Sequence, residues 1–272
     1  MRPCFKALTI TDGQTGRPIR ETRDGLKDPA GAAKDAAERE WAEALLQYWR
    51  GQLERVKKRL APGIPKSRKA IGDLPQRLDA DFWRNENEEL LALFLPLLSD
   101  AAVGGAEILE TQTESLGLML DWTLPNAEAV EWARRYSGEL IKGINATTKE
   151  GVRQALAGWL DTPGSTMGDL FGTLDGMFAF GPKRAQMIGV TEVTRAYFEG
   201  NQAAARATET EGLVKWKKVW QTNKDNLVCS LCAPLDGRSV VGTDKEFPDG
   251  AGQGPPRHPR CRCWCTYDAV VE

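Results

Sequence analysis

The sequence predicts a mainly α protein that ends in a small β module, an α+β fold. Apolar residues recur every three or four positions through most of the chain before residue 212, which is the period of an amphipathic helix. After Gly212 the sequence becomes rich in β-branched and aromatic residues and then in glycine and proline, as strands and turns are. Five of the six cysteines lie in this last part, between Cys229 and Cys265, and we therefore expect the β module to be zinc-bound.

The chain divides into four predicted parts. These are an extended N-terminal arm (1–34), an N-terminal helical region (35–124), a second helical part (125–211) and a zinc-binding β and loop module (212–272). The arm mixes glycine, proline and charged residues with little apolar periodicity, so it needs a partner surface to become ordered. The predicted helices span 35–60, 81–122, 126–144, 149–160, 165–178 and 182–211.

Three local signals divide or bend these helices. Pro96 removes a backbone donor and is expected to kink the second helix, and Gly104 with Gly105 is a possible break in it. The Asn-Ala-Thr-Thr sequence at 145–148 is expected to cap the helix that begins at Lys149. In the module we expect one strand around Trp216 and a final strand over residues 260–267.

Composition excludes several classes of protein. With 272 residues, 41% hydrophobic and 27% charged, the chain is typical of folded globular proteins and not of disordered ones. The longest apolar stretches, such as residues 90–98, are far shorter than the ~20 residues that cross a bilayer, so we expect no membrane partner. A net charge of -2 gives no overall attraction to nucleic acid. No basic-then-apolar leader is recognised, so we expect synthesis in the cytosol, where thiols stay reduced.

Two clusters of metal-ligating residues carry the strongest chemical signal. Cys229 and Cys232 flank a tight Ser-Leu turn, and His258, Cys261 and Cys263 return three further donors after a loop of glycine and proline. Zinc binds four such donors in a tetrahedron, and a fully protein-ligated site is structural because it has no open position for substrate. The alternative is a set of reduced buried cysteines or a labile disulfide.

The sequence leaves two candidates for the fourth ligand, Cys261 and Cys263. His258 and Cys261 form the more natural second pair, whereas a strand would place Cys261 and Cys263 on one face and could offer Cys263 instead. Cys265 shares that face but lies a further step away, and Cys4 is remote in sequence, so both are left out.

Catalysis is not predicted. His258 is the only histidine, so a histidine-dependent hydrolase would have to use a residue already assigned to the metal. The chain contains no phosphate-binding glycine loop between a strand and a helix. Paired carboxylates on the helices are typical of solvated surface. We therefore expect a protein that is not an enzyme.

Basic residues interleave with tryptophans in the module. This pattern can hold nucleic acid, and the alternative is that the tryptophans pack over the zinc turn while the lysines stay in water. The residues that could contact DNA are Lys215, Lys217, Lys218, Arg257, Arg260 and Arg262.

The order of these motifs resembles the head morphogenesis domain of the phage Mu F-like minor head proteins. The family pattern is a helix with Thr-Glu and a nearby Arg, a Trp-containing strand, an Asp, Cys-x-x-Cys, a Gly, Pro-Pro and His-Pro-x-Cys-Arg-Cys. This chain supplies Thr191, Glu192, Arg195, Trp220, Asp225, Cys229, Cys232, Gly237, Pro255, Pro256, His258, Pro259, Cys261, Arg262 and Cys263. The resemblance runs from about Pro125 to Tyr267. The chain departs from the pattern at Cys265, which is an additional cysteine, and at Val190, where the family often has Arg.

The resemblance implies a minor head protein of a tailed phage, built into the prohead in low copy number near the portal vertex or the inner capsid face. It implies the portal protein or the major capsid protein as partner, a place in the virion after assembly in the host cytoplasm, and in some relatives a link to DNA packaging or delivery. Two rivals remain: a zinc-dependent nucleic-acid-binding protein and, with less support, a hydrolase of the zinc-nuclease kind. Some relatives carry a fused toxin or enzyme domain, which the chain length leads us not to expect.

Overall fold

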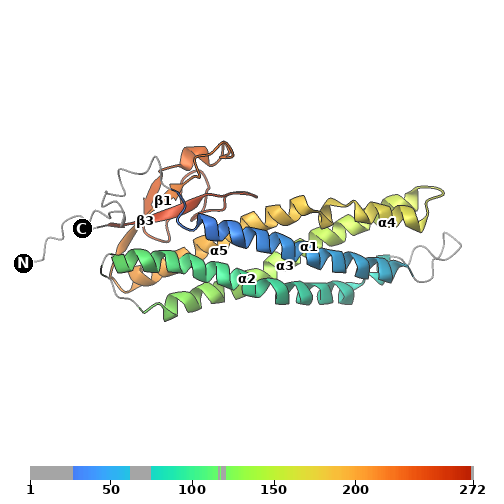
Figure 1. The fold of residues 1–272 in the computed structure, drawn as a ribbon, viewed down its shortest axis with the longest axis horizontal. Helices are drawn as coiled ribbons and strands as arrows, with labels where there is room; N and C mark the ends of the chain where they lie inside the picture. The colour runs from blue at the N-terminus through green and yellow to red at the C-terminus, as the bar shows by residue number, and fades with distance from the viewer. Residues whose placement is uncertain (1–26, 62–74, 116, 118–120, 271–272) are drawn as a thin grey trace, which may run out of the picture. The chain divides into compact units, whose positions relative to one another are not determined.

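The computed structural model describes residues 27–61, 75–115, 117 and 121–270. Its order of elements follows the prediction, with helices first and a small sheet last (Figure 1). The helices are α1 (Gly31–Leu60), α2 (Ala80–Ser115), α3 (Thr123–Asp161), α4 (Met167–Asp175) and α5 (Pro182–Thr210), with short 3-10 turns η3 (Pro75–Arg77), η4 (Phe178–Phe180) and η5 (Ala233–Leu235). The strands are β1 (Lys215–Gln221), β2 (Ser239–Val241) and β3 (Trp264–Val270).

The chain forms two compact units, each built from segments that are distant in sequence. The sheet unit combines Met1–Ala37, Leu98–Ala133 and Val190–Glu272, and the helical unit combines Glu38–Leu97 and Arg134–Gly189. Each unit has its own buried apolar residues.

The helical unit is held by the apolar stripe that the sequence predicts for its first helix. Trp41, Leu45 and Trp49 follow one another at intervals of four residues on α1, and each is at most 1% exposed. The ring of Trp41 packs edge-on against Phe94 of α2, with ring centroids 4.8 Å apart. Aromatic side chains of this size contribute much of the free energy of burial, so the stripe explains why these helices pack together.

Helix α3 corrects the prediction of a break at residues 145–148. The helix runs without interruption from Thr123 to Asp161. The hydroxyls of Thr147 and Thr148 donate to the carbonyls four residues earlier in the same helix, at 3.0 and 3.1 Å. Asn145 is buried and accepts a hydrogen bond from the Gln52 side chain of α1. Polar residues that often cap a helix are therefore used here inside one, because carbonyls of the same helix satisfy the two threonines and a tertiary partner satisfies Asn145.

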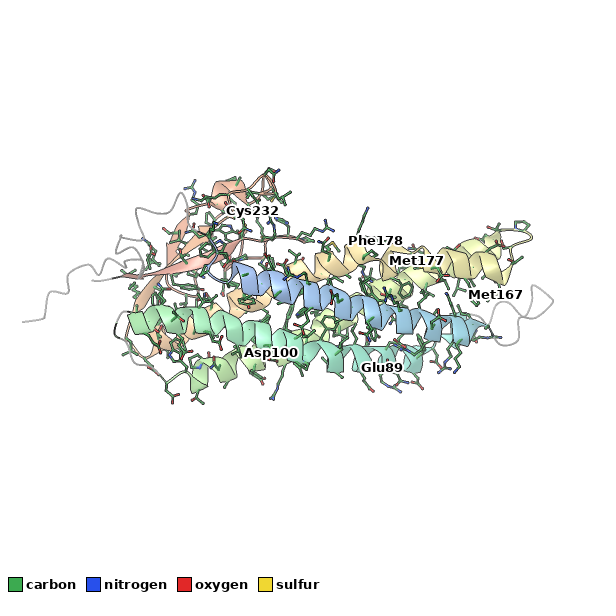
Figure 2. The ribbon with its side chains drawn as sticks, viewed as in Figure 1. Glu89, Asp100, Met167, Met177, Phe178 and Cys232 are labelled. Carbon is green, nitrogen blue, oxygen red and sulfur yellow. The ribbon has the colours of Figure 1, made fainter. Side chains whose placement is uncertain are left out.

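The short helix predicted after α3 is present in the helical unit as α4. Thr166 caps α4, and its side chain and that of Asp169 bond each other's backbone N–H groups, which is a capping box. The predicted helix ends earlier than residue 178, at Asp175, and η4 follows. The ring of Phe178 is 59% exposed, and Figure 2 shows it directed away from the ribbon.

Helix α2 corrects the prediction of a break at Gly104 and Gly105, because it is continuous from Ala80 to Ser115 and contains Pro96. It ends before the predicted residue 122. In the sheet unit, a methyl group on Gly105 would collide with the backbone of Tyr197, and one on Gly200 would collide with the backbone of Ala102. These glycines let α2 and α5 approach closely and do not end a helix.

By length and composition, α2 is also long and apolar enough to cross a membrane, because the stretch Ala80–Glu114 contains an 18-residue window with a mean hydropathy of 1.5. The predicted limit concerned contiguous apolar residues, whereas this window can include charged ones, so the expectation of no membrane partner stays a prediction. Core helices of soluble proteins meet the same criterion, and one such helix is weak evidence for a membrane span. Leu90, Phe94 and Leu98 of this helix are fully buried.

The sheet has three antiparallel strands in the order β2-β1-β3, with Trp220 of β1 opposite Cys265 of β3. The first strand lies where the sequence predicts it. The final strand begins at Trp264 and not at residue 260, so Cys261 and Cys263 both precede it. The alternation of a strand therefore cannot decide which of these two cysteines faces a metal.

The sheet packs on tryptophans that the sequence left open between core and surface. Trp216 and Trp220 are fully buried, edge-on to Tyr267 and to Phe247, with ring centroids 6.2 and 5.3 Å apart. They share one apolar cluster with Cys232, Cys261, Cys263 and Cys265. The alternative in which the tryptophans pack over the cysteine turn is the one that this fold adopts.

Most of the predicted N-terminal arm, residues 1–26, lies outside the described residues. The end of the arm is part of the sheet unit, because Ala30 and Lys34 are each only 6% exposed. Lys34 Nζ lies 2.7 Å from a carboxylate oxygen of Asp28. Helix α1 begins at Gly31, four residues before its predicted start.

Candidate metal centre

The first cluster of donors is a tight turn between β1 and β2. The carbonyl of Cys229 accepts hydrogen bonds from the N–H groups of Cys232 and Ala233, at 3.1 and 3.0 Å. The chain then continues directly into η5, whose Leu235 is fully buried. This hydrogen bonding fixes Cys229 and Cys232 at the two ends of one turn.

The second cluster begins with another turn, just before β3. The N–H of Cys261 donates to the carbonyl of His258 at 3.1 Å, so these two residues close a four-residue turn. Pro259 occupies its second position and Arg260 its third, where Arg260 has a φ of 63°. A turn with proline second and a positive φ third suits glycine at the third position, and here an arginine adopts it.

Two arginines hold the clusters together. Arg257 donates to the carbonyl of Leu231 in the first turn and to that of Asp249, at 2.6 and 2.8 Å. Arg262 forms an ion pair with Asp225, which lies just before the first turn: its Nη2 donates to both carboxylate oxygens, at 2.9 and 2.7 Å. The planar guanidinium group suits such double contacts. The sequence analysis named both arginines as possible DNA contacts, and Arg262 also as part of the family motif.

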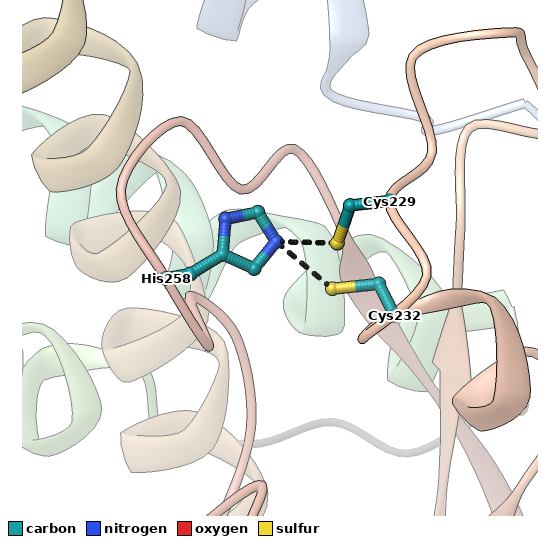
Figure 3. Close-up of side chains that lie close together, drawn as sticks. All are labelled: Cys229, Cys232 and His258. Atoms are coloured by element: carbon teal, nitrogen blue, oxygen red, sulfur yellow. Dashed lines mark hydrogen bonds between the residues drawn. The ribbon is translucent and has the colours of Figure 1, made fainter.

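These clamps bring the donor atoms together. His258 Nε2 lies 3.0 Å from Cys229 Sγ and 3.2 Å from Cys232 Sγ, and Figure 3 shows the imidazole pointing at both sulfurs. Cys232 Sγ lies 3.9 Å from Cys261 Sγ. The donors form two groups of three, Cys229-Cys232-His258 and Cys232-Cys261-Cys263. Within each group, the ligand atoms all lie within 4.8 Å of one another. All five predicted ligands thus meet at one place, with Cys232 common to both groups.

The histidine presents one specific nitrogen to the sulfurs. Its Nδ1 lies 2.8 Å from the carbonyl of Pro259, an acceptor, so Nδ1 carries the proton of the neutral ring and Nε2 the lone pair. Burial lowers the pKa of His258, but its bond to the Pro259 carbonyl and the nearby Cys261 and Cys229 outweigh burial and raise it. Metal-binding histidines generally have such a backbone acceptor on the other nitrogen.

The thiols divide into easily and poorly ionised groups. The hydrogen bond from the Cys263 thiol lowers the pKa of Cys261 to about 5, despite burial. The same bond, together with burial, raises the pKa of Cys263 well above its usual range. Burial and the charge on Cys261 raise the pKa of Cys232 to about 12. In the metal-free protein this hydrogen bond therefore favours ionisation of Cys261 over ionisation of Cys263.

Comparison with known families finds one match. Residues 149–266 match the family described as Phage Mu protein F like protein. This region is phage Mu F-like. The resemblance predicted from the motifs is confirmed over these residues, which include both donor clusters, and it indicates a phage head morphogenesis protein. No curated protein and no solved structure matches the chain.

The fifth cysteine of the Mu F-like region lies apart from the donor groups. Cys265 is in β3, and burial raises the pKa of its thiol to about 12. It belongs to neither group of three donors, as predicted from its position. Cys4 lies outside the described residues.

The prediction that Lys218 contacts DNA is wrong for this fold. Lys218 is fully buried, and its Nζ donates to the carbonyls of Thr243 and Gln253 at 2.5 and 2.9 Å. Burial lowers its pKa to about 8. Lys217 pairs with Asp268 at 3.2 Å, whereas the side chains of Lys215 and Arg260 are exposed. Strand alternation is a signal for this burial, because Lys218 lies on the same face of β1 as the buried Trp216 and Trp220.

We expect Cys229 to be the thiol of the Mu F-like region that alkylating reagents modify fastest in metal-free protein. It is half-exposed, whereas Cys232, Cys261, Cys263 and Cys265 are buried. Burial opposes its ionisation, but hydrogen bonds from Cys232 outweigh burial and lower its pKa. Its iodoacetamide rate should thus level off below the pH of about 8.5 at which an ordinary thiol ionises. Mass spectrometry across a pH series measures this, and equally fast labelling of Cys265 would contradict it.

Proposed function

We propose that this chain is a minor head protein of a tailed phage, which acts in assembly at the portal vertex or the inner capsid face and not in catalysis. The observation that carries the proposal is the match of residues 149–266 to the phage Mu F-like family. The two clamped donor clusters add to it, because they provide the chemistry of a structural metal centre within the matched region. The proposed partner is the portal protein or the major capsid protein.

The donors fit zinc. Cys229, Cys232, His258 and Cys261 are the ligands that we favour, since three thiols and an imidazole are the donor types of structural zinc sites. The 3.9 Å between the sulfurs of Cys232 and Cys261 is close to the edge of about 3.8 Å in a tetrahedron with Zn–S bonds of about 2.3 Å. Cys263 then donates to the Cys261 sulfur from outside the ligand set. A zinc ion bound here would cross-link the two turns.

The favoured ligand set is a closed site. With four protein donors no position is open for water or substrate, which is the condition for zinc hydrolysis. The histidine that a zinc nuclease would use as a base has Nε2 among the sulfurs and Nδ1 against a carbonyl. These contacts favour assembly over the nuclease-like rival.

The structure gives less support to a nucleic-acid-binding function than the pattern of lysines and tryptophans in the sequence does. Base stacking needs exposed aromatic rings, and Trp216 and Trp220 are fully buried. Arg257 and Arg262 bind carbonyl and carboxylate groups of the module itself. Salt-sensitive binding of the full chain to DNA, abolished by substitution of the exposed Lys215 and Arg260, would favour this rival.

Coexpression of the full chain with portal and major capsid proteins tests the assembly proposal. We expect the chain to sediment with proheads in low copy number and to copurify with portal protein. Proheads of normal composition from which the chain is absent would contradict the proposal. The control is the same expression without portal protein, which separates portal binding from binding to the capsid.

The N-terminal arm is the segment that we expect to recognise the larger assembly. The arm contains too few apolar residues to fold alone, so we expect it to need a partner surface. Deletion of residues 1–26 should reduce incorporation into proheads while zinc content and circular dichroism stay unchanged. The deletion stops there because Ala30 and Lys34 are buried in the sheet unit. Normal incorporation of the shortened chain would move the docking role to another segment.

A further inference from the structure

The second ligand turn is bound to helix α5 through one side chain. The backbone N–H of Arg260 donates to the hydroxyl oxygen of Thr191 at 2.9 Å. Thr191 is in the first half of α5 and is only 9% exposed. The two residues are 69 positions apart in sequence, so this contact is tertiary and not a product of local geometry.

The bonded N–H belongs to the residue that lies between two proposed ligands. In the turn from His258 to Cys261, the internal hydrogen bond uses the N–H of Cys261 and leaves that of Arg260 to point out of the turn. Arg260 also has the positive φ that is costly for a residue with a side chain. An external acceptor at this N–H therefore stabilises a backbone conformation that arginine would otherwise leave.

We infer that Thr191 is a positioning residue for the metal centre: its hydroxyl holds the His258–Cys261 turn in the conformation that aims both donors at the ion. The inference rests on the proposed zinc site. Thr191 acts through the backbone of Arg260. Because binding free energies are reciprocal, zinc that stabilises the turn also stabilises its contact with α5.

Removal of the hydroxyl should weaken zinc binding. Thr191→Val keeps the shape of the side chain and loses the acceptor, and the loss of one such hydrogen bond should weaken zinc affinity about three- to tenfold. Thr191→Ser keeps the acceptor and should bind zinc within about twofold of the unaltered chain, since a neighbouring change that spares the bond costs little. Competition with a chelator of known affinity measures these values on the full chain, and exchange of the Arg260 amide should be faster in Thr191→Val only.

Two further variants separate positioning from general destabilisation. Thr113 is a fully buried threonine of α2 in the same unit, and its hydroxyl donates to the carbonyls of Leu109 and Glu110 in its own helix. Thr113→Val should lower thermal stability without changing zinc affinity. In an Arg260→Gly background the turn needs less support, because glycine adopts a positive φ freely, so Thr191→Val should have a smaller effect there.

The outcomes distinguish this inference from the zinc site on which it rests. If the unaltered chain binds zinc and Thr191→Val binds it equally well, the inference is overturned and the zinc site stands. If the unaltered chain binds no zinc, both are overturned. If Thr191→Val does not fold, Thr191→Ala, which also lacks the hydroxyl, takes its place against Thr191→Ser.

Discussion

Purified protein should contain about one zinc ion per chain, and Cys229→Ser or Cys232→Ser should abolish its retention. These two cysteines form one turn, and Cys232 is common to both groups of donors. Loss of one of four ligands opens the tetrahedron and exposes the ion to water and chelators. Elemental analysis after gel filtration with a mild chelator measures the zinc content.

Two matched variants test the order of the remaining cysteines. Cys261→Ser should lose zinc as Cys229→Ser does, whereas Cys263→Ser should weaken it about 10- to 100-fold, as changes in the outer shell of a metal site do. Cys265→Ser is the control, since Cys265 is buried in the same apolar cluster but lies outside the donor groups, and it should retain zinc. Equal zinc loss in all the variants would refute the assignment, as would metal-free protein from a preparation that contained zinc throughout.

Chelation should unfold the sheet unit's C-terminal module while the helical unit stays folded. Structural zinc contributes roughly 10–16 kcal/mol at neutral pH in small domains, which is comparable to the whole stability of about 5–15 kcal/mol of a typical domain. The module has a three-stranded sheet and long turns, and the side chains of Arg257 and Arg262 hold its two cysteine-containing turns together. The helical unit keeps its own buried stripe at Trp41, Leu45 and Trp49.

Amide hydrogen exchange with and without a chelator measures this difference by segment. Residues of β1 and β3 should lose their protection, and the fluorescence of Trp216 and Trp220 should move to longer wavelength as water reaches them. Residues 41–56 of α1 should stay protected, and re-addition of zinc should restore the module. Loss of protection in α1 to the same extent would show that the helical unit depends on the metal.

Periodicity predicts the helices of this chain better than it predicts their ends. Apolar residues recur every three or four positions along α1, and the structure buries them. The capping signals at 145–148 and the glycines of α2 were misleading for one physical reason. Both residue types have local preferences that tertiary contacts override, here the Gln52 amide for Asn145 and the Tyr197 backbone for Gly105.

The candidate donors are predictable because zinc requires particular residue types at short spacings, and all five candidates gather in the fold. Their support is not predictable in this way. The bond from Arg260 to Thr191 and the ion pair from Arg262 to Asp225 join residues 69 and 37 positions apart, and nothing in the local sequence of either partner indicates the other. Lys218 was predicted to lie on the surface because it is charged. It is buried inside the module instead, where two backbone carbonyls accept its hydrogen bonds.

The close crossing of α2 and α5 has a consequence for recognising distant relatives. Gly105 and Gly200 each face backbone of the opposite helix at a distance that admits no side chain. Any relative that keeps this crossing should therefore have glycine in both alignment columns, whether or not it has kept the cysteines. A sequence with the two glycines and without the Cys and His donors would mark a lineage that shares this helix crossing but not the candidate metal centre.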